Sequence, residues 1–237
     1  MVVSEKQFEV RPMLQRLTVS SILLGFILGT MALPPVAQAQ TLQKSTKNRL
    51  YKPRKRSTPK GPTSTTATRG CDVDKFVALA PANDPGQTQS PRPTFAWYIS
   101  QKEPKPLRFE LLNAQQDIIH TINLTSQPGI TEYKLPETAP GLTIGQAYQW
   151  RVIVQCQPGR PSSDQLVSAE IELIAPKPTR STAQEYAEMG LWYDAFAVAT
   201  EQERLQLLSD LANLEAEEPA DKILQQSKAI ETLITPP

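Results

Sequence analysis

Residues 146–156 read QAYQWRVIVQC and alternate apolar with polar side chains. Successive side chains of a β-strand point to opposite faces of the sheet, so this alternation predicts a strand with one apolar and one polar face. Aromatic and β-branched residues, which strands favour, fill most of the apolar positions. The stretch therefore predicts a strand that buries one face in a core. That face carries Tyr148, Trp150, Val152, Val154 and Cys156.

A second pattern lies just before this strand, where Leu142 and Gly145 precede Tyr148 by six and three residues. Together with Trp150, the pattern resembles the entry to the sixth strand of fibronectin type III and related immunoglobulin-like sandwiches, where such a leucine and glycine set the bend before a corner tyrosine. The resemblance implies that the Tyr148 hydroxyl bonds to backbone upstream. It indicates a fold and no chemical activity.

Six further segments with strand character flank this one, separated by turns that contain proline and glycine. The chain has 22 prolines and 10 glycines, and it is 39% hydrophobic and 21% charged, which is typical of a folded chain rich in loops. We therefore expect a mainly β fold, an Ig/fibronectin III-like antiparallel β-sandwich over residues 71–176. The expected strands are 72–80, 94–100, 107–113, 118–124, 130–135, 146–156 and 165–174.

The two cysteines are Cys71 and Cys156. If consecutive strands run in opposite directions, the first strand begins at the end of the sandwich where the sixth strand finishes. A disulfide there would contribute about 4–5 kcal/mol by closing a long loop, in the chain-entropy model. The alternative is two separate buried thiols. We predict the disulfide.

Beyond Pro176 and Pro178 the apolar spacing becomes helical, and a small α-helical module is predicted over residues 180–237. Ser181 and Gln184 have the spacing of a capping box. The third helix is expected to bury Leu205, Leu208, Leu211 and Ala212, and Pro219 suits the first turn of a fourth helix.

The first part of this module resembles half of a tetratricopeptide repeat. Tyr186, Gly190, Trp192 and Ala195 occupy the positions where such a repeat has an aromatic residue, a helix-ending glycine, an aromatic residue and a closely packed alanine. Gln202 stands where a small residue is usual, so the resemblance ends there. It implies a TPR-like groove for a protein partner.

The N-terminal residues have the profile of a signal peptide. A basic stretch is followed by an uncharged, mostly apolar run at 17–33, and small residues precede an expected cleavage between Ala39 and Gln40. The alternative is an uncleaved N-terminal membrane anchor, because the run is near the short end of the about 17–25 residues that span a bilayer. Cleavage of the signal peptide, residues 1–39, would leave a periplasmic or secreted protein with no stable membrane span.

Residues 40–70 contain nine basic residues and no acidic residue. With few apolar side chains and many of Pro, Ser and Thr, this strip is predicted to be a disordered basic linker. The basic arm at 44–69 could bind an anionic surface or polymer, or it could be a solvated spacer. An exported protein seldom meets nucleic acid, so that partner is disfavoured.

Catalysis, metals and cofactors are disfavoured by composition, since the chain has one histidine and two cysteines. His120 lies within a strand pattern and is interpreted as structural. We find no Gly-x-Ser-x-Gly or phosphate-loop motif. The acidic residues Glu215, Glu217 and Glu218 are interpreted as a solvated face that could bind something cationic, including the protein's own basic arm.

Four stretches of the chain carry a further resemblance: residues 69–71, residues 90–95, Tyr148 to Trp150 with the cysteine that follows, and Tyr186 to Ala195. In these stretches the chain resembles the cyanobacterial family called domain of unknown function 928, or DUF928. The resemblance covers residues from about 69 to the C-terminal region. It implies an exported protein of unknown activity with no established catalytic residues.

Two functions remain open from the sequence. The first is an exported, non-catalytic interaction or scaffold protein of the cell envelope, with another protein as its partner. The alternative is a carbohydrate or cell-wall binding module. That alternative needs Tyr98, Trp192 and Tyr193 to form an exposed aromatic platform.

The disulfide prediction is tested by thiol titration of the unfolded, unreduced protein. Because Cys71 and Cys156 are the only cysteines, a disulfide between them leaves no reactive thiol, and reduction before titration should release two. Two reactive thiols without reduction would show that the cysteines are separate.

Overall fold

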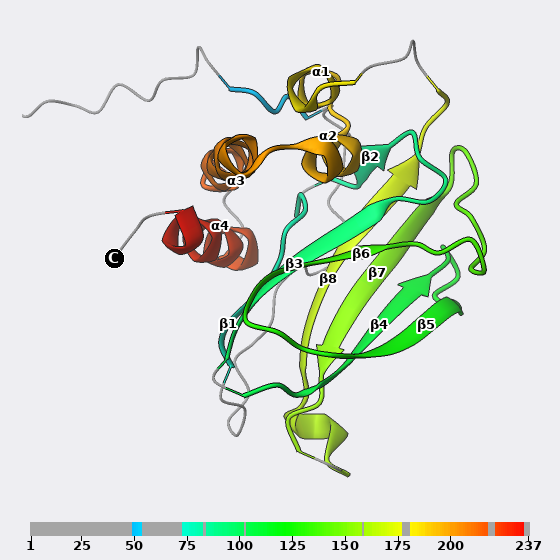
Figure 1. Cartoon of the computed structure of the whole chain (residues 1–237), viewed down its shortest axis with the longest axis vertical. Coiled ribbons are helices and arrows are strands. Elements are labelled where there is room, and N and C mark those ends of the chain that lie inside the picture. Colours follow the sequence, from blue (N-terminus) through cyan, green and yellow to red (C-terminus); the bar gives the residue numbers. More distant parts are fainter. Residues whose placement is uncertain are drawn as a thin grey trace, which may run out of the picture. The chain divides into compact units, whose positions relative to one another are not determined.

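The computed structural model describes residues 49–53, 73–82, 84–101, 103–157, 159–176, 181–217 and 221–234, without the side chains of 221–223 (Figure 1). All of them belong to one unit that spans residues 45–237. The expected signal peptide, the Ala39–Gln40 cleavage site and Cys71 lie outside the described residues.

The described strands form two sheets. The three-stranded sheet is antiparallel, in the order β1-β3-β6. The five-stranded sheet has the order β2-β8-β7-β4-β5, with β2 parallel to β8 and the other pairs antiparallel. The strands are β1 (Val73–Ala78), β2 (Gly86–Thr88), β3 (Thr94–Gln101), β4 (Pro106–Leu112), β5 (Ile118–Thr125), β6 (Gly129–Lys134), β7 (Ala147–Val154) and β8 (Gln165–Leu173), and a short 3₁₀ helix, η2 (Pro161–Ser163), precedes β8.

Seven of these strands lie at or close to the expected ranges, and β2 is the addition. Its three residues pair with β8, with Gly86 beside Ile171. Three residues are too few to show a periodic pattern, and a parallel partner 85 positions away leaves no local signal.

Aromatic side chains join the two sheets through one core. Phe95 of β3 lies with its ring centre 4.9 Å from that of Phe109 on β4 and 5.6 Å from that of Trp150 on β7. Tyr133 of β6 approaches Phe109 to 4.8 Å. Such tilted contacts add to the stabilisation from burial, so the apolar faces of both sheets pack against each other here.

The turn before β7 is fixed by the corner tyrosine. The Tyr148 hydroxyl accepts a hydrogen bond from the Thr143 N–H at 3.1 Å and donates one to Gln146 Oε1 at 3.0 Å. Gly145 has φ +78°, which a residue with a side chain rarely adopts, and Leu142 is buried. The hydrogen bond to upstream backbone therefore holds the chain as it enters the central strand.

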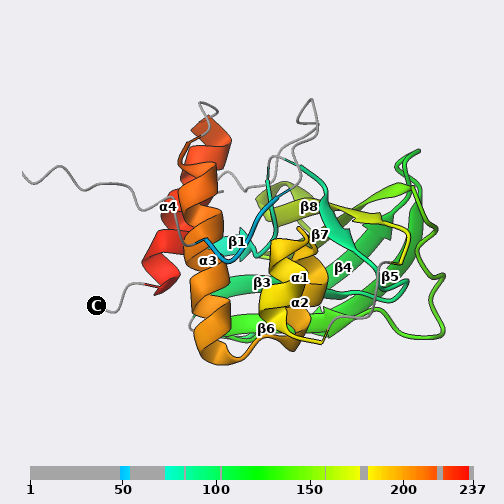
Figure 2. The ribbon, with the colours of Figure 1, turned by 90° about the horizontal axis from the view of Figure 1, so that it is seen from above.

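Four helices follow the sheets: α1 (Ala183–Glu188), α2 (Trp192–Val198), α3 (Glu201–Glu215) and α4 (Asp221–Ile234). Figure 2 shows α3 and α4 side by side next to β1, and α1 with α2 over the sheets. Of the described helices, none is long and apolar enough to cross a membrane.

The helix starts differ in detail from the sequence prediction. The capping box of α1 is formed by Thr182 and Glu185, one residue after the expected Ser181 and Gln184. In α3 the expected core residue Leu205 is exposed, because Leu207 points to the core beside Leu208 and Leu211 instead.

The positions expected from the resemblance to a tetratricopeptide repeat lie in a helix–turn–helix. Gly190 adopts φ +78° and ends α1, and Ala195 is fully buried where α2 packs. Trp192 is buried and Tyr186 is half-buried.

Helix α2 is attached to the sheets by two adjacent aromatic residues. Trp192 Nε1 donates to the carbonyl of Leu79 at 2.9 Å. Trp150 Nε1 donates to the Tyr193 hydroxyl at 2.7 Å, and that hydroxyl donates to the Glu170 carbonyl at 3.0 Å. A Cβ atom on Gly86 would lie 2.6 Å from the Tyr193 ring, so the ring needs glycine at this place.

Candidate functional site

Residues 49–53, here called the strap, lie against the helices far from their place in the sequence. Figure 1 draws the strap in blue beside α1. The Lys52 N–H donates to the carbonyl of Ala187 in α1 at 3.1 Å. The strap has no helix or strand hydrogen bonds of its own, so its described backbone bonds go to the helices.

Asp210 of α3 holds the strap by its backbone. Its Oδ2 accepts the N–H of Leu50 at 2.5 Å and the N–H of Tyr51 at 3.0 Å. Its Oδ1 accepts Gln206 Nε2 at 2.9 Å. Asp210 is only 3% exposed, so this carboxylate depends on those three donors in place of water.

Tyr51 anchors the strap in the core. The residue is 3% exposed, and its ring meets that of Trp192 edge to face, with centres 4.9 Å apart. Burial, with the nearby carboxylates of Asp84 and Glu215, raises the pKa of Tyr51, so the hydroxyl keeps its proton. The buried core therefore includes an aromatic side chain from a segment well outside the sheets.

An ion pair lies at the edge of this site. Arg49 Nη2 lies 2.7 Å from Glu217 Oε1, and the carboxylate side chain is 41% exposed. A pair in contact with water contributes at most about 1 kcal/mol. This ion pair therefore contributes little to the binding of the strap.

The prediction of disorder through 40–70 is therefore wrong for residues 49–53. The strip has few apolar residues, so its composition does not indicate that Tyr51 is buried. The partners of Tyr51, Trp192 and Asp210, are more than 140 residues away in the sequence. The rest of the strip, including most of the 44–69 arm, lies outside the described residues.

Beneath the strap is a buried polar cluster. Glu215 Oε1 accepts the Ala82 N–H at 3.0 Å and Gln226 Nε2 at 3.3 Å, and the same Gln226 amide donates to the Ala80 carbonyl at 2.9 Å. Glu215 is 1% exposed, so the expectation of a solvated acidic face is wrong at this position. Burial raises the pKa of Glu215 well above its ordinary value, offset only in part by the Ala82 hydrogen bond.

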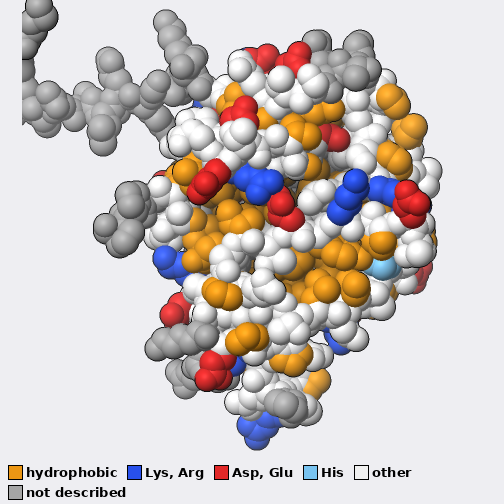
Figure 3. Space-filling view, in the orientation of Figure 1, with side chains coloured by type: hydrophobic (Ala, Val, Ile, Leu, Met, Phe, Trp, Pro, Cys, Tyr) orange, Lys and Arg blue, Asp and Glu red, His pale blue; other side chains and the backbone are white. Residues whose placement is uncertain are grey.

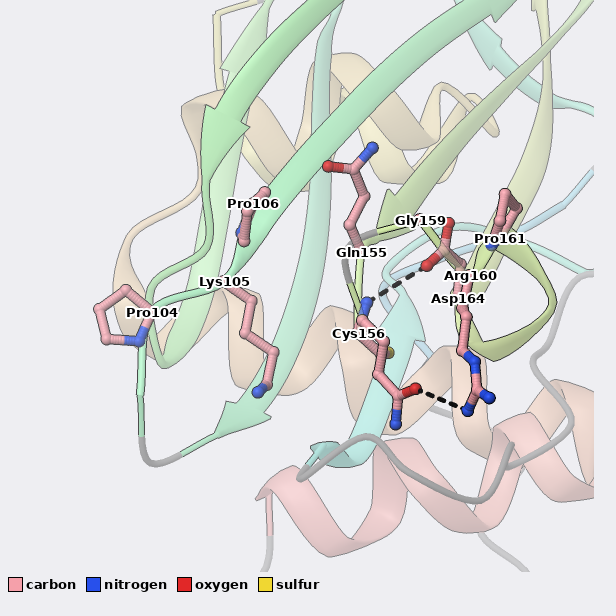
Figure 4. Close-up of a pocket in the computed structure, with 10 residues that line it drawn as sticks. Pro104, Lys105, Pro106, Gln155, Cys156, Gly159, Arg160, Pro161 and Asp164 are labelled. Atoms are coloured by element: carbon pink, nitrogen blue, oxygen red, sulfur yellow. Dashed lines mark hydrogen bonds between the residues drawn. The ribbon is translucent and has the colours of Figure 1, made fainter.

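A second feature is an open pocket of about 450 Å³ at the end of β7 (Figure 4). Its charged side chains are Lys105, Arg160 and Asp164. Two hydrogen bonds join residues that line it, from the Cys156 N–H to Asp164 Oδ1 at 3.2 Å and from Arg160 Nη1 to Gln157 Oε1 at 3.4 Å.

The same end of the sheets carries the predicted disulfide partner Cys156. Gln165 pairs with Val154 in the β7–β8 ladder and reaches the Val73 carbonyl with its side-chain amide at 3.4 Å. The start of β1 and the end of β7 therefore lie close together. Because Cys71 is outside the described residues, the disulfide stays a prediction.

The aromatic platform is not formed. Trp192 is 0% and Tyr193 is 2% exposed, so both belong to the core, and Tyr98 is half-buried. His120 lies between the sheets, with Nε2 2.7 Å from the Tyr133 hydroxyl, and burial lowers its pKa. Within the described residues no group of His, Cys, Asp and Glu side chains could hold a metal ion.

Comparison with known proteins identifies the family. The family described as "Domain of Unknown Function (DUF928)" matches residues 60–233. The chain belongs to this family. The match begins earlier than the residue 69 expected from the sequence, and the strap lies before it. No curated protein sequence matches the chain.

One similar solved structure is the solution structure of the fn3 domain of the human collagen alpha-1(XX) chain. It is 10% identical, with a TM-score of 0.25, and the alignment covers 54% of this chain and 94% of that one.

Replacing the strap's anchor should destabilise the protein. We expect Tyr51→Ala to lower the free energy of unfolding by about 3 kcal/mol, because it empties a buried aromatic site beside Trp192. Urea unfolding measures the change. Lys52→Ala, at an exposed side chain in the same segment, is the control; equal stabilities for the two variants would show that the strap is not part of the folded core.

Glu215 should make stability depend on pH. With its pKa raised by burial, the folded state keeps a proton that the unfolded state releases, so stability falls as pH rises above the ordinary carboxyl range. Glu215→Gln removes this dependence while it keeps the oxygen that accepts the Ala82 N–H.

The test is urea unfolding between about pH 4 and about pH 8. The stability of Glu215→Gln relative to the wild type should increase steadily with pH, whereas the exposed control Glu188→Gln should show a constant difference. A constant difference for Glu215→Gln would mean that Glu215 is ionised in the folded protein.

Proposed function

We propose that this DUF928 protein is an exported interaction protein without catalytic activity. In this proposal the two sheets form a rigid β-sandwich, and the TPR-like helices bind an extended segment that has an aromatic residue next to basic residues. Export rests on the apolar run at 17–33 and the small residues before Gln40.

The observation that carries the proposal is the way Asp210 and Trp192 hold the strap. A carboxylate that accepts two successive backbone N–H groups recognises an extended chain whatever its side chains. The space beside Trp192 adds selection for an aromatic ring. These are the two parts that peptide-binding sites combine: backbone hydrogen bonds for affinity and a side-chain site for specificity.

The strap is the occupant of this site within the chain itself. A tethered segment acts at an effective concentration of about millimolar, so an outside segment competes only when the strap has been released. The site therefore favours a partner that presents a matching segment at high local concentration, as proteins of one envelope assembly do.

The alternative, a carbohydrate-binding module, would need an exposed aromatic platform, and the residues expected to form it are not exposed. Trp192 and Tyr193 make their hydrogen bonds inside the protein and leave no ring face for a sugar. The same burial supports the interaction function, because the Trp192 ring packs edge to face with that of Tyr51.

The experiment uses the full chain with Tyr51→Ala, which empties the aromatic site and leaves Asp210 in place. A fluorescent peptide with the sequence of residues 47–55 should bind this variant saturably by fluorescence anisotropy, and should bind the wild type far more weakly because the strap fills the site. Circular dichroism confirms that the variant is folded.

Two controls make the result specific. A peptide with alanine in place of tyrosine should lose binding, and so should the protein that also carries Asp210→Ala. Equal peptide binding by the wild type and Tyr51→Ala, or saturable binding of the alanine peptide, would contradict the proposed site.

A further inference from the structure

The two sheets have four edge strands, β1, β2, β5 and β6, among the described residues. An edge strand offers unpaired backbone N–H and C=O groups to any other strand, so proteins usually protect edges with charges, bulges, short length or a covering element. The four edges differ in this respect.

Three of them are protected. β1 has a register irregularity between Val73 and Lys75, exposed charges at Asp74 and Lys75, and α4 packed against it. β2 has only three residues and lies under α2. β6 carries Glu132 and Lys134, and Arg204 of α3 lies 2.8 Å from the Glu132 carboxylate.

β5 has almost none of these features. Its eight residues, IIHTINLT, include no charged residue and no proline. The one irregularity, beside Ile119, is at the start of the strand, and from His120 to Thr125 the pairing with β4 is regular. β6 belongs to the other sheet and is linked to β5 through the His120 and Tyr133 side chains, not through a backbone ladder.

The β4–β5 hairpin also holds this edge rigid. Asn113 Oδ1 accepts the N–H groups of Gln115 and Asp117 at 3.0 and 2.8 Å, which fixes the turn. In the region of Figure 3 that corresponds to β5 and β6 in Figure 1, apolar side chains reach the surface between polar ones. A preformed, uncharged and regular edge needs no reordering before it pairs with another strand.

We propose that β5 pairs with β5 of a second copy of this chain in an antiparallel dimer. In an antiparallel pair around a twofold axis, residues on the same face meet, and the central residue meets its own copy. With Ile122 at the centre, Ile122 meets Ile122 on the inner face, and Thr121 meets Asn123 twice on the exposed face.

This register is self-complementary. Thr121 and Asn123 are both exposed and can hydrogen-bond to each other, and no charged pair opposes the contact. Pairing joins two five-stranded sheets into one whose outer edges are both the short, covered β2. The dimer thus closes both β5 edges and leaves none for a third copy, which favours a closed pair over a fibre.

Sedimentation velocity of the protein purified from cells that produce the full chain tests the proposal. The wild type should sediment as a dimer. The variant Thr121→Lys with Asn123→Lys should be monomeric, since four ammonium groups gather at the contact. Both positions are exposed, so the fold itself should be kept. The matched control is Thr143→Lys, which adds a charge at an exposed residue outside the strands and should remain dimeric.

A charge-reversal variant tests the register. Thr121→Lys combined with Asn123→Glu brings each lysine opposite a glutamate of the other copy, so this variant should recover the dimer that the two lysines abolish. A monomeric wild type, including one that pairs only with a different protein, would overturn the proposal. So would a dimer that persists with both lysines.

Discussion

The hydrogen bond from Trp150 Nε1 to the Tyr193 hydroxyl joins the central strand of the large sheet to the helices. The hydroxyl in turn donates a hydrogen bond to the Glu170 carbonyl in β8, so three elements share one buried chain of hydrogen bonds. A buried polar group without its partner costs about 1–3 kcal/mol, so removing the Tyr193 hydroxyl would leave the buried Trp150 N–H unpaired at about that cost. The position of Tyr193 also requires glycine at residue 86 in β2, because the Tyr193 ring leaves no space there for a Cβ atom.

This junction places the strap site. With Tyr193 turned to the sheet, its neighbour Trp192 turns to Leu79, and its ring packs edge to face with that of Tyr51. The acidic residues Glu215, Glu217 and Glu218 suggested binding to the basic arm by charge. Among the described residues of the arm, Arg49 forms an ion pair with Glu217 that is partly exposed. Asp210 contributes more, since its buried carboxylate is satisfied by backbone N–H groups and not by a cation.

The sequence predicted what local patterns encode. Alternation located seven strands, and the Leu142, Gly145 and Tyr148 spacing located the corner, because each depends on neighbours a few residues away. Long-range partners decided the rest. Tyr51 is an isolated aromatic in a basic strip, Glu215 lies in an acidic run, and Trp192 and Tyr193 are adjacent on a short helix, where solvent exposure of one was a reasonable expectation. All four are buried by segments distant in the sequence.

The physical boundary of the folded part thus differs from the boundary of the family match, which begins at residue 60. A chain cut at that residue keeps every described strand and helix but loses the strap. Asp210 would then lack two of its three donors, and the Trp192 ring would lose its contact with Tyr51. A carboxylate in that position must draw in water or take a new backbone partner. The Asp210 carboxylate and the Trp192 ring, left without these partners, would weaken the shortened protein. The same two groups give the site an affinity for an extended aromatic segment.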